Sequence, residues 1–235
     1  MKHTTKIKNF CILGERNSGT NFLHSAVDLN FELKYKQVCN KHFWRNETRL
    51  EDYTNLAVIV IIRNLFDWIN SMHHSPFHLQ PELKHPKNKL DFLNKQFWSV
   101  YDDVNEHGKW VGREIQEDRH LVTGTRYKNI LQARYVKYSH FLRLMESNNH
   151  IYLIKYEDLN GEYEKNMKLI ADYYGIKFKD SEIKKVNTYR GFKKSQKMID
   201  IKPKPKIFSE TEITSHEDFN LNKEIEFGYK DDFSL

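Results

Sequence analysis

The stretch Phe10–Leu23, which reads FCILGERNSGTNFL, decides the fold. An apolar run ends at Gly14, a short polar loop with a second glycine, Gly19, follows, and helical periodicity begins at Thr20. This order of strand, glycine-bounded loop and helix start forms a cradle for anions. Backbone N–H groups of the loop turn inward, and the helix N-terminus adds the positive end of its dipole. The sequence therefore predicts a phosphate-binding loop after the first strand.

The spacing Gly14-x4-Gly19 fits the P-loop of ATP- and GTP-binding proteins, in which Lys and then Ser or Thr follow. Here Thr20 and Asn21 follow instead. A loop without the Lys or the Mg²⁺-binding hydroxyl suits a phosphate that is held but not hydrolysed. The stretch resembles the 5′-phosphosulfate loop of the sulfotransferases, whose donor is 3′-phosphoadenosine 5′-phosphosulfate (PAPS) and whose loop commonly reads Lys/Arg-[Ser/Thr]-Gly-Thr-[Thr/Asn]. For this stretch alone, an ordinary strand–turn–helix junction stays open.

The resemblance implies that loop residues hold the donor's 5′-phosphosulfate, namely Glu15, Arg16, Asn17, Ser18, Gly19, Thr20 and Asn21. The family usually has Lys or Arg where Asn17 stands, and that cation bridges the leaving phosphate. Arg16 stands one position earlier. We therefore expect either Arg16 or Lys41 to supply this charge.

A second segment follows the strongest strand signal, Leu56–Ile62, whose continuous β-branched run predicts burial on both faces. The family's 3′-phosphate segment reads Arg-Asn-Pro-x-Asp and places a Ser eight residues after the Arg. Four residues match it in register: Arg63, Asn64, Asp67 and Ser71. Arg63 can offer a planar fork to a phosphate, and Ser71 lies two helical turns further on. We expect Asp67 to brace the loop or cap backbone amides; a surface ion pair is the alternative for Arg63.

A third segment, Asn40–Trp44, resembles the Lys-Thr-His-Leu-Pro of cytosolic sulfotransferases, in which the His is the catalytic base. His42 precedes Arg63 by 21 residues, close to the family's spacing. The resemblance implies that His42 removes the acceptor's proton and that Lys41 stabilises the leaving group. The alternatives are a loop histidine without a catalytic role, and Glu15 as the base. His24 is a weaker candidate, expected to pack.

Two later basic regions are less specific. Tyr189–Lys194 falls where the family has a loop that closes over the 3′-phosphate, which would make Arg190 and Lys193 donor ligands; a solvated charge run is the alternative. Arg134 and Lys137 share a helix face, which points either to the site or to solvent, and we slightly favour solvent for both. Tyr156–Leu159 resembles a recurrent family segment and is expected to be structural.

Strands alternate with helices along the chain, which predicts an α/β fold: a three-layer sandwich with a central, mostly parallel sheet of the P-loop nucleotide-binding type. The expected strands are Ile7–Leu13, Phe31–Val38, Leu56–Ile62 and Ile151–Lys155, and the expected helices are Thr20–Leu29, Leu65–Met72, Leu90–Val104, Tyr127–Met145, Glu162–Tyr174 and Asp180–Val186. Because ligands bind beyond the carboxyl ends of such strands, the first two segments can face one crevice. Residues 73–126 are expected to form an insertion or lid over the acceptor site. The chain is expected to be loop-like from Thr188, with an acidic, peripheral end.

Length and composition limit the number of domains, the class of protein and its cellular location. A chain of 235 residues fits one domain, residues 1–235, and 39% hydrophobic, 30% charged and 14% aromatic residues describe a soluble globular protein. The net charge of +6 suits an anionic ligand and does not by itself mean nucleic acid. Cys11 and Cys39 are expected to be buried thiols in a reducing compartment. Without a signal peptide or an apolar run of roughly 20 residues, we expect a cytoplasmic protein or a trimmed piece of an anchored one.

Together the segments predict a sulfotransferase that moves a sulfuryl group from PAPS to a hydroxyl or amine of a small-molecule or glycan acceptor. The product would be 3′,5′-adenosine bisphosphate (PAP), and no metal is required. One alternative is a P-loop kinase for a small molecule or nucleoside, which would need a Lys and a Mg²⁺ ligand that the loop lacks. Another is a non-catalytic nucleic-acid binder, but the chain has no basic stripe with interleaved aromatics. We expect a monomer or homodimer that binds neither nucleic acid nor membranes.

Overall fold

The computed structural model describes residues 6–38, 40–42, 55–147, 150–186, 188–190, 198–200, 205–230 and 233, with backbone alone for 105–106, 188–190 and 198–200. The chain forms two compact units, which are described separately. The first comprises Met1–His42, Asn46–Arg63 and Arg143–Pro203. The second comprises Phe43–Arg45, Asn64–Leu142 and Lys204–Leu235. No helix in the described ranges is long and apolar enough to cross a membrane.

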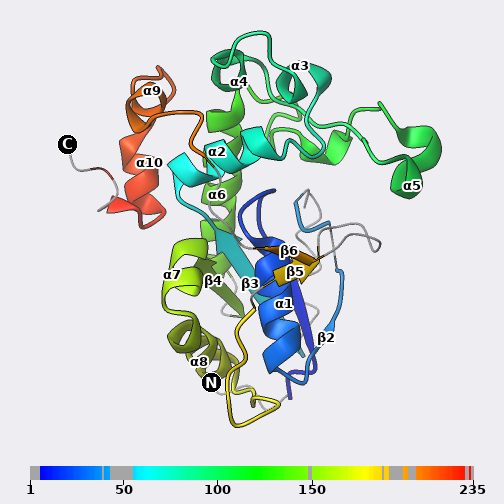
Figure 1. Ribbon diagram of the computed structural model, residues 1–235, viewed down its shortest axis with the longest axis vertical. Coiled ribbons are helices and arrows are strands. Elements are labelled where there is room, and N and C mark those ends of the chain that lie inside the picture. The colour runs from blue at the N-terminus through cyan, green and yellow to red at the C-terminus, as the bar shows by residue number, and fades with distance from the viewer. Residues whose placement is uncertain are drawn as a thin grey trace. The chain divides into compact units, whose positions relative to one another are not determined.

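The first unit contains a four-stranded parallel sheet in the order β2-β1-β3-β4 (Figure 1). Its strands are β1 (Asn9–Leu13), β2 (Lys34–Tyr35), β3 (Leu56–Ile62) and β4 (Ile151–Lys155). All seven residues of β3 are buried, as the continuous apolar run predicted. The bounds of β3 and β4 agree with the prediction, whereas β2 is much shorter than Phe31–Val38. The α/β class with a mostly parallel sheet is confirmed.

Helices α1 (Thr20–Asn30), α7 (Tyr156–Gly161) and α8 (Tyr163–Tyr174) belong to this unit. Leu23 and Val27 of α1 and Met167 of α8 share one hydrophobic core with Ile12 and Ile59 of the sheet. This core fixes the start of α1 directly beyond the end of β1.

Two expectations for the end of this unit are wrong. Residues 180–186 form no helix. The segment after Thr188 is not a plain loop, because β5 (Thr188–Arg190) and β6 (Met198–Asp200) pair antiparallel. The register of such a pair depends on contacts between strands, which a polar, irregular sequence pattern does not reveal.

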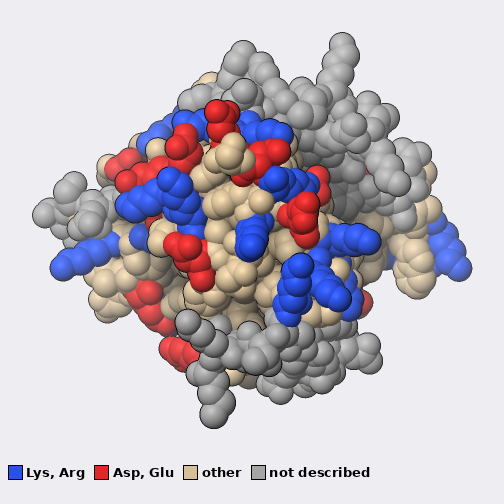
Figure 2. All heavy atoms as spheres, turned by 90° about the horizontal axis from the view of Figure 1, so that it is seen from below, with Lys and Arg blue, Asp and Glu red and all other residues tan. Residues whose placement is uncertain are grey.

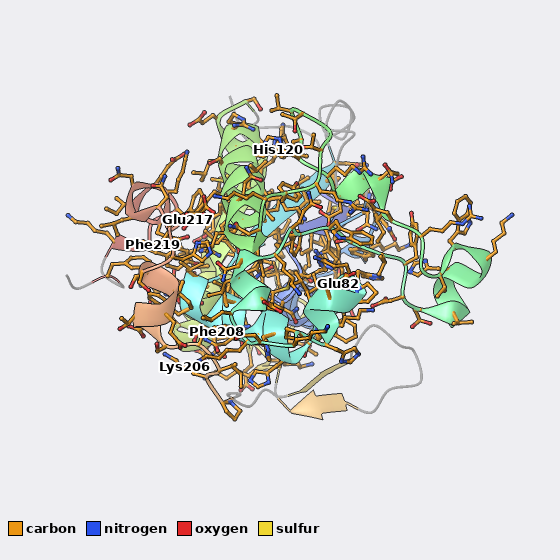
Figure 3. All side chains as sticks on the ribbon, turned by 90° about the horizontal axis from the view of Figure 1, so that it is seen from above. Glu82, His120, Lys206, Phe208, Glu217 and Phe219 are labelled. Atoms are coloured by element: carbon orange, nitrogen blue, oxygen red, sulfur yellow. The ribbon has the colours of Figure 1, made fainter. Side chains whose placement is uncertain are left out.

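The second unit is helical (Figures 1 and 3). Its helices are α2 (Leu65–His74), α3 (Pro81–Lys84), α4 (Asp91–Asn94), α5 (Val104–His107), most of α6 (Ile130–Ser147), α9 (Glu210–Thr214) and α10 (Leu221–Glu226). Trp68, Tyr127 and Phe208 lie in its core. Phe208, labelled in Figure 3, packs against Phe92 with ring centroids 5.9 Å apart.

The helix expected over Leu90–Val104 is wrong beyond its first turn. Asp91–Asn94 are helical, the chain is extended from Lys95, and a separate helix, α5, begins at Val104. Phe97 then pairs with Tyr127, and Val100 with Glu114, through isolated bridges. Phe92, Leu93, Phe97 and Val100 are buried. Their spacing resembles the apolar stripe of a helix, but Phe97 and Val100 pair with distant residues instead.

The solvent-facing interpretation of Arg134 and Lys137 is also wrong. Arg134 donates twice to the carboxylate of Glu224, from Nε and Nη2, each over 2.7 Å, and both side chains are fully buried. Lys137 pairs with buried Asp118. The acidic end of the chain is therefore part of the core of this unit, because a carboxylate ninety residues away neutralises a cation of α6.

Candidate functional site

The predicted phosphate loop lies between β1 and α1. Asn17 (φ 60°) and Gly19 (φ 101°) both adopt left-handed backbone conformations. Gly19 also lies against Tyr156, since a Cβ there would be 2.4 Å from Cδ2 of the ring. A Cβ on Gly14 would be 2.7 Å from the carbonyl oxygen of Ile61. Both glycines are thus required by close packing around the loop.

Polar groups inside the loop hold its shape. The hydroxyl of Ser18 donates to the carbonyl oxygen of Glu15 over 2.6 Å. The backbone N–H and Nε of Arg16 donate to Oε1 of Glu15 over 2.7 and 3.0 Å. Glu15 and Arg16 are both 2% exposed. The carboxylate of Glu15 is therefore committed to an ion pair within the loop.

The Lys41-His42 segment is held against the loop. The N–H of Gly14 donates to the carbonyl oxygen of Lys41 over 3.0 Å, and Lys41 Nζ donates to Asn21 Oδ1 over 2.7 Å. His42 Nδ1 lies 2.7 Å from the carbonyl oxygen of Gly14. Since a carbonyl only accepts, Nδ1 carries the hydrogen, and in the neutral ring the lone pair is on Nε2.

His24 packs on α1. Its ring stacks on Tyr35, with centroids 4.4 Å apart, and meets the edge of Phe10 at 5.4 Å. Burial lowers the pKa of His24, and the Lys41 ammonium lowers it further. This histidine is therefore held neutral in an aromatic cluster.

Arg63 is brought to the phosphate loop although it lies 46 residues after Asn17. Its Nη1 donates to the carbonyl oxygen of Asn17 over 3.1 Å, because β1 and β3 are neighbours whose carboxyl ends meet. The guanidinium lies 4.5 Å from the centroid of the Tyr156 ring. Tyr156 was missed as a site residue. Its position directly after β4, at the same edge of the sheet, was the available signal.

The remaining members of the second segment lie in the second unit. Asn64 Oδ1 accepts from the N–H groups of Phe66 and Asp67 over 2.9 and 3.3 Å. Asn64, and not Asp67, is therefore the N-cap of α2. Ser71 is half-buried on α2, and the joint grip of Arg63 and Ser71 on a 3′-phosphate stays a prediction.

A protein-family model described as the sulfotransferase domain matches residues 52–234. The chain belongs to the sulfotransferase family. Among solved structures, this sulfotransferase is similar to mouse sulfotransferase SULT7A1 complexed with PAP, at 16% sequence identity and a TM-score of 0.43. The match covers 76% of this chain and 62% of the mouse chain. No curated protein matches the sequence.

The resemblance that rested on the three segments is confirmed at the level of the family. The family model begins after the phosphate loop and after Lys41-His42, so the roles of these two segments stay predictions. Two predicted donor ligands cannot be placed: Lys193 and the side chain of Arg190 lie outside the described residues.

Proposed function

We propose that this sulfotransferase transfers a sulfuryl group from PAPS to a hydroxyl or amine of a small-molecule or glycan acceptor and releases PAP. The observation that carries the proposal is the attachment of Lys41 and His42 to Gly14, at the start of the phosphate loop. A base and a cation are thereby joined to an anion cradle. The backbone amides of Asn17 and of Gly19–Asn21, with the hydroxyl of Thr20, would hold the 5′-phosphosulfate, whereas the amide and hydroxyl of Ser18 both donate to the carbonyl oxygen of Glu15.

In the proposed step, the acceptor oxygen or nitrogen forms a bond to sulfur while the bond from sulfur to the bridging oxygen of the donor breaks. The electrons of that bond remain on the phosphate of PAP. The acceptor's proton moves to Nε2 of His42, and the hydrogen bond to the Gly14 carbonyl keeps the ring in the required tautomer.

Lys41 is the better candidate for the cation that stabilises the leaving phosphate. The guanidinium of Arg16 is paired with the buried carboxylate of Glu15, and Lys41 Nζ reaches Asn21 Oδ1 beside the loop. The carboxylate of Glu15 weakens the attraction between the Arg16 guanidinium and the negative charge that develops on the leaving phosphate. Arg63, braced by Tyr156, would hold the 3′-phosphate together with Ser71, Arg190 and Lys193.

Titration calorimetry tests the donor. PAP is expected to bind without Mg²⁺, and Mg-ATP is not. Mg-ATP binding without PAP binding would establish the kinase alternative instead. DNA binding without PAP binding would favour a nucleic-acid binder. The face shown in Figure 2 does not favour that outcome, because its basic side chains are interspersed with acidic ones. A screen of sugars, phenols and amines with labelled PAPS then identifies the acceptor. The cytoplasmic location and the monomeric or dimeric state stay predictions from the sequence.

A further inference from the structure

A cluster of aromatic and basic side chains lies in the second unit, around the short helix α5 and the turn Gly108–Trp110. Within that unit, α5 lies far from α9 and α10 (Figures 1 and 3). The ring centroid of Tyr101 is 4.8 Å from that of His107 and 6.5 Å from that of Trp110. Trp110 is 48% exposed, which is a large apolar surface to leave in water. We call Tyr101, His107, Lys109, Trp110 and Arg113 the Trp110 cluster.

Two cations lie over the ring of Trp110. The guanidinium of Arg113 is 4.8 Å from its centroid, and Lys109 Nζ is 5.8 Å away. In the described parts of the chain, neither cation pairs with a carboxylate. By contrast, Arg119 and Arg126 both bond Glu114. Two cations without an ion pair among the described residues therefore lie beside the exposed tryptophan. A carboxylate also acts on the cluster, since burial raises the pKa of Tyr101 and the charge of Glu117 raises it further.

Hydrogen bonds to Asp102 hold His78, which contacts His107 of the cluster. His78 donates to Asp102 from its backbone N–H over 2.7 Å and from Nδ1 over 2.9 Å, and Lys84 Nζ donates to the same carboxylate over 2.8 Å. Burial raises the pKa of Asp102, but these hydrogen bonds outweigh it and hold the pKa well below its usual range. His78 has φ 58°, an uncommon conformation for a residue with a side chain. Its ring meets the edge of His107, with centroids 5.6 Å apart.

The chemistry of the cluster selects among acceptor classes. An exposed aromatic face beside polar groups suits the C–H face of a pyranose, whereas a phenol prefers a closed apolar pocket. A guanidinium-bearing or amine acceptor would meet Arg113 and Lys109, which repel it. These two cations instead match a carboxylate or sulfate, and the fork of Arg113 can bind either in a bidentate manner.

We propose that the Trp110 cluster is a binding site for an acidic sugar, a pyranose that carries a carboxylate or a sulfate group. As the site of the sulfuryl acceptor it rests on the proposed function. As a binding site it stands on the geometry of the cluster alone.

Saturation-transfer NMR and calorimetry on the full chain test the proposal, with methyl β-glucuronide, glucose 6-sulfate and the neutral methyl β-glucoside as probes. Both acidic sugars are expected to bind about tenfold more tightly than the glucoside, because only they can form a charge-assisted contact with Arg113 or Lys109. Binding of one acidic sugar alone identifies the anionic group. Equal binding of acidic and neutral sugars, or none by any probe, overturns the proposal.

Three variants sharpen the test. Trp110→Ala is expected to weaken the acidic sugar about tenfold or more, and Arg113→Ala to remove the preference for acidic over neutral sugars. Arg126→Ala is the matched control, because Arg126 also lies over a tryptophan, 4.0 Å from Trp98, but is paired with Glu114. It is expected to bind sugar like the wild type. Unchanged sugar binding in Trp110→Ala contradicts the site.

PAP titration of the same proteins separates this proposal from the proposed function. All variants are expected to bind PAP as the wild type does. A wild type that binds acidic sugar but not PAP would overturn the sulfotransfer reaction and leave the sugar site standing. A wild type that binds PAP but no sugar probe would overturn the sugar site and leave the sulfotransfer reaction standing.

Discussion

At the scale of single residues, one hydrogen bond orients the ring of His42. The bond from Nδ1 to the Gly14 carbonyl orients the ring and leaves Nε2 as the basic atom. The ring therefore needs no carboxylate to be held in one tautomer.

His42→Ala is expected to lower turnover by about 10² to 10⁴-fold, the usual contribution of a general base, while the affinity for PAP stays within about twofold. Turnover with labelled donor and PAP titration measure the two effects. His85→Ala is the control, because His85 is an exposed histidine of the second unit. Full turnover in His42→Ala would move the base elsewhere, with Glu15 next to be tested.

Tyr156 acts through Arg63, so it is a positioning residue. Tyr156→Ala removes the ring under the guanidinium and is expected to weaken PAP about tenfold, since such a contact is worth about 1–2 kcal/mol. Tyr156→Phe keeps the ring and should bind PAP like the wild type. Equal weakening in both variants would show that the hydroxyl, not the ring, matters.

At the scale of elements, the phosphate loop depends on a glycine for two separate reasons. Gly19→Ala places a Cβ against Tyr156 and also requires a left-handed backbone from a residue with a side chain. We expect loss of PAP binding and a lower melting temperature.

Gly175→Ala is the matched control for the loop, because Gly175 also has a positive φ, 62°, but open space around its Cβ position. Gly175→Ala should lower the free energy of unfolding by about 1–2 kcal/mol, the cost of a left-handed backbone for a residue with a side chain, and should leave PAP binding unchanged. If the two variants lose equal stability and both bind PAP, packing against Tyr156 is not what fixes the loop.

Helix α10 offers a second comparison within one element. Glu224→Gln leaves the buried guanidinium of Arg134 without its counter-charge and is expected to cost about 3–5 kcal/mol of unfolding free energy. Lys223→Ala breaks the exposed pair with Glu226 on the same helix and should cost less than about 1 kcal/mol. Denaturant unfolding measures both, and a small loss in Glu224→Gln would contradict the anchoring of α10 on α6.

At the scale of the whole molecule, the fold responds to alkaline pH through Tyr163. Its hydroxyl donates to the carbonyl oxygen of Lys184 and accepts from Asn30 Nδ2, which ties α8 to α1 and to residue 184. Burial raises the pKa of Tyr163 to about 12. Because the folded pKa is the higher one, its contribution is complete below pH 10 and is lost as pH rises toward 12.

Tyr163→Phe removes this titration. Its stability is expected to be lower than that of the wild type at pH 8 and to fall less steeply between pH 10 and 12. Thermal melts across that range measure the slope. Tyr173→Phe is the comparison, because burial raises the pKa of Tyr173 too but this residue is 45% exposed, so a smaller change of slope is expected. Parallel slopes in Tyr163→Phe and the wild type would contradict this assignment.

Local sequence determined the parts of this protein that depend on local properties. The run Leu56–Ile62 predicted β3 because burial on both faces requires an unbroken apolar strand. The two glycines around positions 15–18 predicted the loop because backbone geometry is set by the residue itself. The resemblance of three segments to sulfotransferase motifs predicted the family, which the match to the sulfotransferase domain confirms. A single domain over residues 1–235 stays a prediction.

Only the tertiary structure decided which side chains meet across long stretches of sequence. It placed Arg63 on Asn17 and Tyr156, neutralised Arg134 with Glu224, and turned an expected helix after Lys95 into extended chain. The physical reason is the same in each case. From sequence alone, a cation is predicted to lie in solvent, and regularly spaced apolar residues are predicted to form one face of a helix. The distant residue that buries either one is known only from the structure.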